Sequence, residues 1–131
     1  MSAAARLRTA LEARDLDAAV ATMAPDVVFR SPIVHKPYHG PEAVRALLEG
    51  VMAVFEDFRY ERVIGAPDAV DHALVFAARI GDRELQGSDF LHENADGRID
   101  EFTVMVRPLT GAMALADGMR AHFEAEGVPA P

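Results

Sequence analysis

The sequence predicts an α+β fold in which helices pack on one face of a strongly curved, mostly antiparallel sheet. Two halves of the 131-residue chain differ in pattern. From Ala3 to about Phe55, apolar residues mostly recur at helical spacing, whereas from Phe58 to Arg107 the chain has strand-like runs joined by turns. Sequential strands with tight turns form an antiparallel meander, and helices that precede it cover one of its faces. The length suits a single domain over residues 1–131.

The first two helices are short. Apolar residues at helical spacing predict a helix from Ala3 to about Ala13. A second short helix is expected to follow it. Either Asp15 or Asp17 can cap its start, because an aspartate oxygen accepts a hydrogen bond from exposed helical amides, and Pro25 is expected to stop it.

A short strand and a loop come before a longer helix. Residues 26–31 have β character, and the prolines and glycine of residues 32–40 predict an irregular loop. Ser31 is interpreted as a turn residue. Pro41 suits a first helical turn, so a helix is predicted from there to about Glu56, with its apolar positions on one stripe.

Four strands and a last helix complete the chain. The strands are predicted at residues 58–65, 73–80, 84–93 and 98–107. Gly81-Asp82 and the stretch Asn94 to Gly97 are typical of tight turns between antiparallel strands. Residues 112–126 again have a partly helical period.

Composition and charge exclude several classes of function. A formal net charge of −8 disfavours binding to nucleic acid or to an anionic membrane, since both need a positive surface. The chain has no cysteine, so disulfides, thiolate catalysis and sulfur-ligated zinc are excluded. No apolar run reaches the length of a signal peptide or a membrane-spanning helix. We therefore expect a soluble cytoplasmic protein.

Two segments resemble a known superfamily. The first is APDVVFRSPIVHKPYHGPEAV, between a short and a long helix, and the second is LQGSDFLHENADGRIDEFTVMVRP. Together they resemble the nuclear transport factor 2-like superfamily, most closely its SnoaL-like branch and ketosteroid isomerase. The resemblance implies a cone, with a bent sheet around the long helix and an apolar pocket between them. Members include isomerases, polyketide cyclases and non-catalytic binding proteins, and many are homodimers packed sheet to sheet.

Asp89 is the strongest catalytic candidate. Period-two alternation places it on one strand face with Leu85, Gly87 and Leu91. If that face points inward, burial would raise the pKa of the carboxyl group and suit it to act as a general acid or hydrogen-bond donor. The resemblance implies the same role, because Asp89 matches the carboxylic acid that stays protonated in ketosteroid isomerase. In the alternative orientation, Asp89 is solvated and Phe90 lies inside.

The loop before the long helix departs from the isomerase pattern. In ketosteroid isomerase, an Asp directly before a proline is the general base, whereas here that position is Ser31. A hydroxyl needs its own activating base to take a proton from carbon, so isomerisation by that mechanism is disfavoured. His35 and His39 lie in the same loop and are candidates for an acid–base partner of Asp89. The alternative is that both are exposed loop residues.

A mostly apolar pocket with one or two polar groups would suit a small hydrophobic ligand. Aromatic residues and methionines supply much of its expected wall, and Phe90 belongs to the same set. On the last strand, the face of Glu101, Thr103, Met105 and Arg107 is one of two that can point inward. The candidate ligand-binding residues are Phe29, Ile33, Tyr38, Met52, Phe55, Phe58, Tyr60, Phe76, Leu91, Phe102 and Met105.

Two functions stay open at this point. One is a cofactor-free enzyme that performs acid–base isomerisation, cyclisation or dehydration on a small apolar substrate. The other is a non-catalytic ligand-binding or accessory protein of the same fold. The histidine and acidic residues have no metal-ligand spacing, and no cofactor motif occurs. Ala73–Ala78 and Phe102–Val106 are apolar on both faces, which predicts a homodimer through the sheet.

Overall fold

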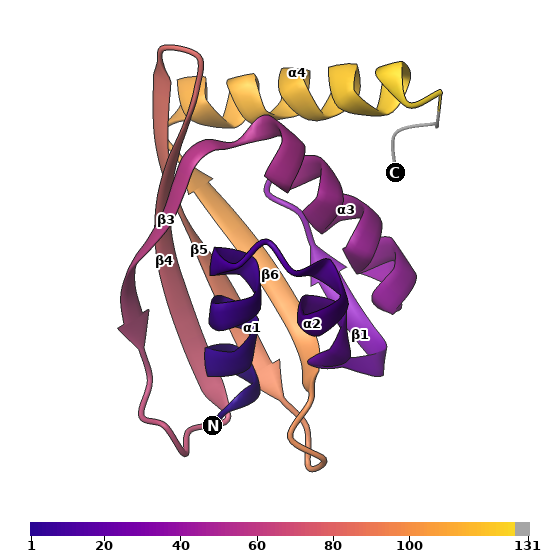
Figure 1. Ribbon diagram of the computed structural model, residues 1–131, viewed down its shortest axis with the longest axis vertical. Helices are drawn as coiled ribbons and strands as arrows, with labels where there is room; N and C mark the ends of the chain where they lie inside the picture. Colours follow the sequence, from indigo (N-terminus) through magenta and orange to yellow (C-terminus); the bar gives the residue numbers. More distant parts are fainter. Residues whose placement is uncertain (128–131) are drawn as a thin grey trace.

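The computed structural model describes residues 1–127 and confirms the α+β fold (Figure 1). Four helices and six strands follow one another in the described chain. In order, they are α1 (Ala3–Glu12), α2 (Leu16–Ala21), β1 (Met23–Arg30), β2 (Tyr38–His39), α3 (Pro41–Val54), β3 (Glu56–Ile64), β4 (Asp71–Ile80), β5 (Arg83–Glu93), β6 (Ile99–Arg107) and α4 (Leu109–Ala125).

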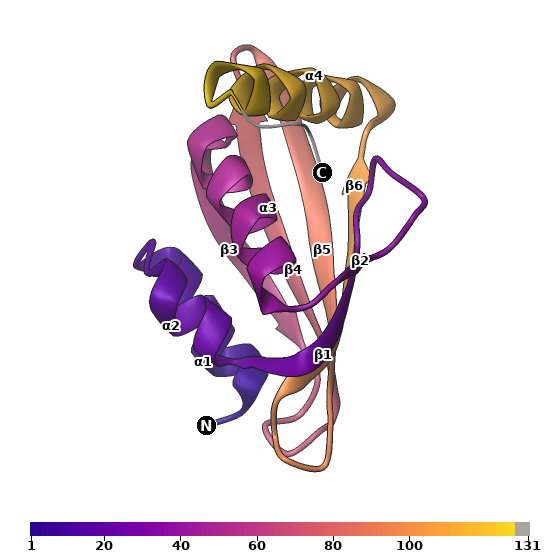
Figure 2. The same ribbon diagram turned by 90° about the vertical axis from the view of Figure 1, so that its right-hand side faces the viewer.

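The strands form one curved sheet with the order β2-β1-β6-β5-β4-β3. Strands β3 to β6 pair as the predicted antiparallel meander. Strand β1 pairs in parallel with β6, so the first and last long strands are neighbours. Helices α1, α2 and α3 lie on one side of the sheet and α4 crosses one end (Figure 2). The inner face of the sheet is therefore covered and its outer face is open.

Local residue chemistry explains where the helices begin. The Asp15 side chain caps α2 and accepts a hydrogen bond from the Ala18 amide at 3.1 Å, which selects Asp15 over Asp17. Pro41 lies at the start of α3, as predicted, because its fixed φ suits a first turn and its missing N–H is not needed there.

The segment around Pro25 differs from the prediction. Helix α2 already ends at Ala21, and Pro25 lies exposed within β1. The pairing of β1 with β6 shifts register between Met23 and Val28, and this irregularity accommodates a residue that has no N–H to donate. The loop expected to be irregular also contains β2, which pairs with β1.

The core lies between the inner face of the sheet and the helices. The largest fully buried side chains are Phe102, Leu7, Leu74, Ile99, Val27 and Val44. Because Phe102 faces inward on β6, its neighbours Thr103 and Met105 belong to the outer face. Among residues 1–127, no helix has the length and apolar character needed to cross a membrane.

Candidate functional site

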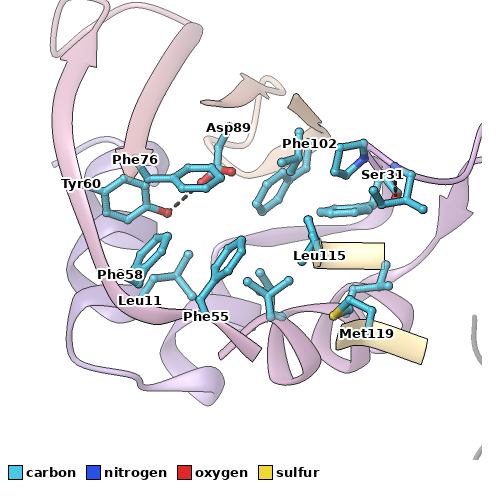
Figure 3. Close-up of a pocket in the computed structure, with 17 residues that line it drawn as sticks. Leu11, Ser31, Phe55, Phe58, Tyr60, Phe76, Asp89, Phe102, Leu115 and Met119 are labelled. Atoms are coloured by element: carbon cyan, nitrogen blue, oxygen red, sulfur yellow. Dashed lines mark hydrogen bonds between the residues drawn. The ribbon is translucent and has the colours of Figure 1, made fainter. Parts of the chain in front are cut away.

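An apolar cavity of about 80 Å³ lies between the inner face of the sheet and the helices (Figure 3). All strands except the two-residue β2 contribute to its wall, together with α1, α3 and α4. Its polar side chains are those of Ser31, Tyr60 and Asp89. The lining residues are Leu11, Phe29, Ser31, Pro32, Ile33, Leu47, Leu48, Val51, Phe55, Phe58, Tyr60, Phe76, Asp89, Phe102, Val104, Leu115 and Met119.

Asp89 is buried, with 5% of its surface exposed, and its carboxyl group faces this cavity. The Tyr60 hydroxyl donates a hydrogen bond to Oδ2 of Asp89 at 2.7 Å. Burial raises the pKa of Asp89 to about 7, although the hydrogen bond from Tyr60 lowers it in part. The pKa of Tyr60 lies well above its usual value, because burial and the nearby Asp89 charge both disfavour a phenolate. Tyr60 therefore remains a donor.

The alternation along β5 places Asp89 inward, which is one of the two orientations that the sequence leaves open. Leu85, Gly87, Asp89 and Leu91 are buried, while the residues between them are less covered. At Gly87 there is no room for a side chain, because a Cβ would overlap the ring of Phe76 and approach the Met105 carbonyl oxygen at 2.8 Å. The absent side chain lets the Phe76 ring lie close against β5.

Aromatic rings surround the Tyr60 end of the cavity. The Phe58 ring lies 5.0 Å from that of Tyr60 and 5.3 Å from that of Phe76, measured between centroids. Phe55 continues this wall, at 5.8 Å from Phe76. These rings exclude water from the hydrogen-bonded pair, which is the physical reason that the neutral form of Asp89 is favoured.

The geometry gives the two carboxyl oxygens of Asp89 different roles. Since Tyr60 donates to Oδ2, a protonated Asp89 carries its own hydrogen on Oδ1. That hydrogen is available to a carbonyl or hydroxyl oxygen in the cavity. After ionisation, Oδ1 instead accepts a proton or a hydrogen bond. A carboxyl group with a pKa near neutrality can therefore act either as a proton donor or as a proton acceptor.

Ser31 lies at the opposite end of the cavity from Tyr60 (Figure 3). Its hydroxyl oxygen accepts hydrogen bonds from the amides of Ile33 at 3.0 Å and Val34 at 3.3 Å. These contacts confirm its predicted role as a turn residue. Within residues 1–127, no basic side chain donates to or accepts from this hydroxyl, so Ser31 has no activating base.

The structure does not bring His35 or His39 to Asp89. Both residues are exposed, and neither lines the cavity. His39 pairs with Val28 across the β1–β2 ladder, at the edge of the sheet. His35 lies in the loop that precedes β2. The structure therefore agrees with the alternative interpretation that both histidines are exposed, although His39 lies in β2.

The predicted ligand-binding residues fall into two groups. Phe29, Ile33, Phe55, Phe58, Tyr60, Phe76 and Phe102 line the cavity. Tyr38, Met52, Leu91 and Met105 do not. Met105 is 60% exposed, because the inward position of Phe102 turns every second residue of β6 outward. Phe90 is likewise on the outer face and is 42% exposed, since Asp89 points inward.

Three of these residues, Leu91, Met52 and Tyr38, lie outside the cavity lining for different reasons. Leu91 is on the inner face but packs in the core. Met52 lines a smaller hollow beside Arg14 and Leu11, which adjoins the cavity. Tyr38 lines a separate hollow that adjoins the cavity.

Several cavity residues were not among the sequence candidates. They are aliphatic residues of α1, α3 and α4, and their helical periodicity was visible in the sequence. Periodicity shows that such a stripe is buried, but the same stripe suits a solid core and a cavity wall equally. These residues are Leu11, Leu47, Leu48, Val51, Leu115 and Met119, with Pro32 and Val104 from a loop and a strand.

A cluster of possible metal ligands lies away from the cavity. His92, Asp100 and Glu101 offer ligand atoms within 4.8 Å of one another. His92 Nδ1 lies 2.8 Å from Asp100 Oδ1, and that hydrogen bond, with the Asp100 charge, raises the pKa of His92. Glu101 also pairs with Arg30 at 3.5 Å. His92 and Asp89 are three residues apart on β5 and therefore face opposite sides of the sheet.

Comparisons with solved structures agree with the fold and differ in the function that they name. The chain is 42% identical to a steroid delta-isomerase from Pseudomonas aeruginosa, with a TM-score of 0.87 over 95% of this chain and 93% of that one. It is 33% identical to an uncharacterised bacterial protein with a cystatin-like fold from Silicibacter pomeroyi DSS-3, with a TM-score of 0.88 over 95% and 87% of the two chains.

A more distant similarity shows the fold alone. It is to a polyketide cyclase, described as putative, from Pseudomonas putida KT2440, at 18% identity and a TM-score of 0.68 over 86% of this chain and 96% of that one. No curated protein matches the sequence. The family model described as a SnoaL-like domain matches residues 4–102, which is most of the chain. The chain therefore belongs to the SnoaL-like family.

Proposed function

We propose that the protein binds a small, largely apolar molecule that carries a carbonyl or hydroxyl group, and that it performs cofactor-free acid–base chemistry on that molecule. Asp89 is the proton-transfer group. Tyr60 is a positioning residue that holds the Asp89 carboxyl through a 2.7 Å hydrogen bond. Isomerisation, cyclisation and dehydration all need a proton to move at or near a polarised oxygen, and this pair supplies that step.

The observation that carries this proposal is the isolated carboxyl group in an apolar cavity. A buried acid is costly unless it is neutral or paired, so its presence among phenylalanines needs an explanation beyond stability. The pKa of about 7 makes both protonation states accessible near neutrality. The similarity to a protein named as a steroid delta-isomerase, at 42% identity, supports a steroid-like, largely apolar molecule as a substrate type.

A specific observation favours the second candidate, a non-catalytic binding protein. The cavity holds one titratable carboxyl group, no imidazole lines it, and the Ser31 hydroxyl accepts hydrogen bonds from two amides. A reaction that needs a separate acid and base would lack one of them. Under this alternative, Asp89 and Tyr60 hold the oxygen of a bound ligand and the reaction occurs elsewhere.

Deuterium exchange at the α-carbon of a bound cyclic ketone distinguishes the two functions. We expect the wild-type protein to accelerate this exchange in D₂O, measured by proton NMR. The Asp89→Asn variant should lose about a hundredfold or more of the acceleration, since general acid–base catalysis typically supplies that much. Asp82→Asn is the matched control, because the Asp82 side chain is 98% exposed at a turn.

Each outcome of this experiment has a definite meaning. Equal exchange rates for wild type and Asp89→Asn would show that Asp89 does not transfer the proton. Binding of the ketone without any accelerated exchange would support the non-catalytic alternative. The His35→Ala and His39→Ala variants should exchange at the wild-type rate, because both side chains are outside the cavity.

We also propose that a second copy of the chain covers the outer face of the sheet. Apolar side chains are exposed there, with Phe90 at 42%, Met105 at 60% and Ile64 at 46%. Asp71 and Glu101 lie toward one end of this face, and Arg107 lies toward the other. A two-fold axis through the face would place each acidic end near the arginine of its partner.

Sedimentation velocity at micromolar concentration tests this association. We expect the wild-type chain to sediment as a dimer and the Met105→Glu variant as a monomer, because the substitution would bury a charge in the interface. Met113→Glu is the matched control, since Met113 is 57% exposed but lies on α4. A monomeric wild type, or a dimeric Met105→Glu variant, would contradict the proposal.

A further inference from the structure

A second hollow, of about 180 Å³, adjoins the cavity where α4 meets the loop after β1. Ser31, Ile33, Leu47 and Met119 line both spaces, so the two lie side by side. We call the second space the vestibule. Its full lining is Ser31, Ile33, Val34, Tyr38, Leu47, Ala116, Met119, Arg120 and Phe123. A ligand longer than the cavity would extend into it.

The pairing of the strands gives the separation of Asp89 and Ser31, which lines both the cavity and the vestibule. Asp89 pairs with Val104 across the β5–β6 ladder. Arg30 pairs with Thr103 across the β1–β6 ladder, so Ser31, the next residue, lies beside Val104. Asp89 and Ser31 are therefore separated by two strand spacings, about 10 Å. Figure 3 shows the same arrangement, with Tyr60 and Asp89 at one end and Ser31 and Met119 at the other.

Arg120 is the one positively charged side chain among the residues that line either space. Its guanidinium approaches Asp117 at 3.4 Å, through one nitrogen only, and its side chain is 63% exposed. Most of its five N–H donors therefore have no protein acceptor among residues 1–127. Tyr38, whose side chain carries a hydroxyl group, lines the same space. The vestibule thus combines a cation with a neutral donor beside an apolar channel.

The inner end and the vestibule favour different chemical groups of a ligand. The inner end is dry and contains an acidic carboxyl group, so a carboxylate placed there would lose its hydration and face Asp89. The vestibule is open to solvent and offers a guanidinium, whose planar fork fits a carboxylate. An elongated ligand with a ketone and a carboxylate would therefore place the ketone inside and the carboxylate at the vestibule.

We propose that Arg120, with Tyr38, binds the carboxylate of an elongated hydrophobic keto acid, which is the substrate class of this site. The ketone end of this assignment rests on the proposed function of Asp89 and Tyr60. The carboxylate end rests on the vestibule alone. The ketone assignment can therefore be wrong while the carboxylate assignment is right, and the reverse.

Isothermal titration calorimetry with two probes tests the proposal. The probes are 9-oxodecanoate, a keto acid long enough to span both ends, and its methyl ester, which has the same ketone and chain but no charge. We expect the wild-type protein to bind the acid more tightly than the ester by about threefold, because an exposed ion pair contributes modestly. In Arg120→Gln this preference should disappear while the affinity for the ester is unchanged.

A matched control and a second variant make the outcomes separable. Arg83→Gln should keep the preference, since Arg83 is another exposed arginine, at 59%, outside both spaces. Equal wild-type affinities for acid and ester, or a preference that persists in Arg120→Gln, would overturn the vestibule assignment. Asp89→Asn should keep the preference for the acid over the ester, because the proposal assigns the carboxylate to Arg120. If Asp89→Asn accelerates deuterium exchange at the wild-type rate while Arg120→Gln removes the preference, the proposed function fails and the vestibule assignment stands.

Discussion

Between about pH 4 and about pH 7, the free energy of unfolding is expected to fall by roughly 3 kcal/mol through Asp89 alone. In the unfolded chain, Asp89 ionises with an ordinary pKa of about 3.9, whereas burial raises its pKa to about 7 in the folded protein. The folded state therefore holds a proton that the unfolded state has already lost. The stabilisation is fully present below the lower pKa and disappears as the pH rises through the higher one.

Chemical denaturation across this pH range, compared between wild type and Asp89→Asn, isolates this contribution. Other groups titrate in the same window, among them His92, whose pKa is also raised. Their contributions cancel in the difference between the two proteins. We expect that difference to change by roughly 3 kcal/mol in the direction that favours Asn at high pH. A difference independent of pH would show that Asp89 has an ordinary pKa in the folded protein.

Truncation of Leu74 to alanine is expected to cost about 3–5 kcal/mol of unfolding free energy, the range typical of buried leucines. Leu74 is fully buried on the inner face of β4 and pairs with Asp89 across the β4–β5 ladder. Its loss would leave a gap beside the aromatic wall. Thermal or urea denaturation at about pH 5, where Asp89 is neutral, measures the effect.

Leu109→Ala is the matched control for this variant. Leu109 is 76% exposed at the start of α4, so its truncation should change stability by about 0.5 kcal/mol or less. Similar losses for both variants would contradict the assignment of Leu74 to the core.

Local pattern was sufficient to predict most of the fold. The helical and strand-like halves, the meander of four strands and an aspartate cap at Asp15 or Asp17 all follow from spacing and side-chain chemistry near in sequence. The parallel pairing of β1 with β6 did not follow, because it joins segments that are far apart in the chain and has no local pattern. Pro25 was interpreted as the end of a helix, whereas it lies in β1. A shift in the register between β1 and β6 accommodates it there.

The site was predictable where one face of a strand was clearly more apolar than the other. Leu85 and Leu91 bracket Asp89 at period two, and this pattern made an inward Asp89 one of two open orientations, which the structure then selects. On β6 both faces are apolar, so the outward position of Met105 could not be chosen from the sequence. The partner of Asp89 was also unpredictable, because Tyr60 comes from β3, and two register shifts along that strand disturb its alternation.

The most direct test of a neutral, proton-bearing Asp89 in the cavity is the titration of its own carboxyl group. Carbon-13 NMR of the aspartate side chains, with Asp89→Asn used to assign the resonance, reports the ionisation of that group by itself. The hydrogen bond from Tyr60 and the enclosing aromatic rings predict a midpoint at a pH of about 7. A midpoint at the ordinary aspartate pKa of about 3.9 would contradict the proposed role of Asp89 in proton transfer.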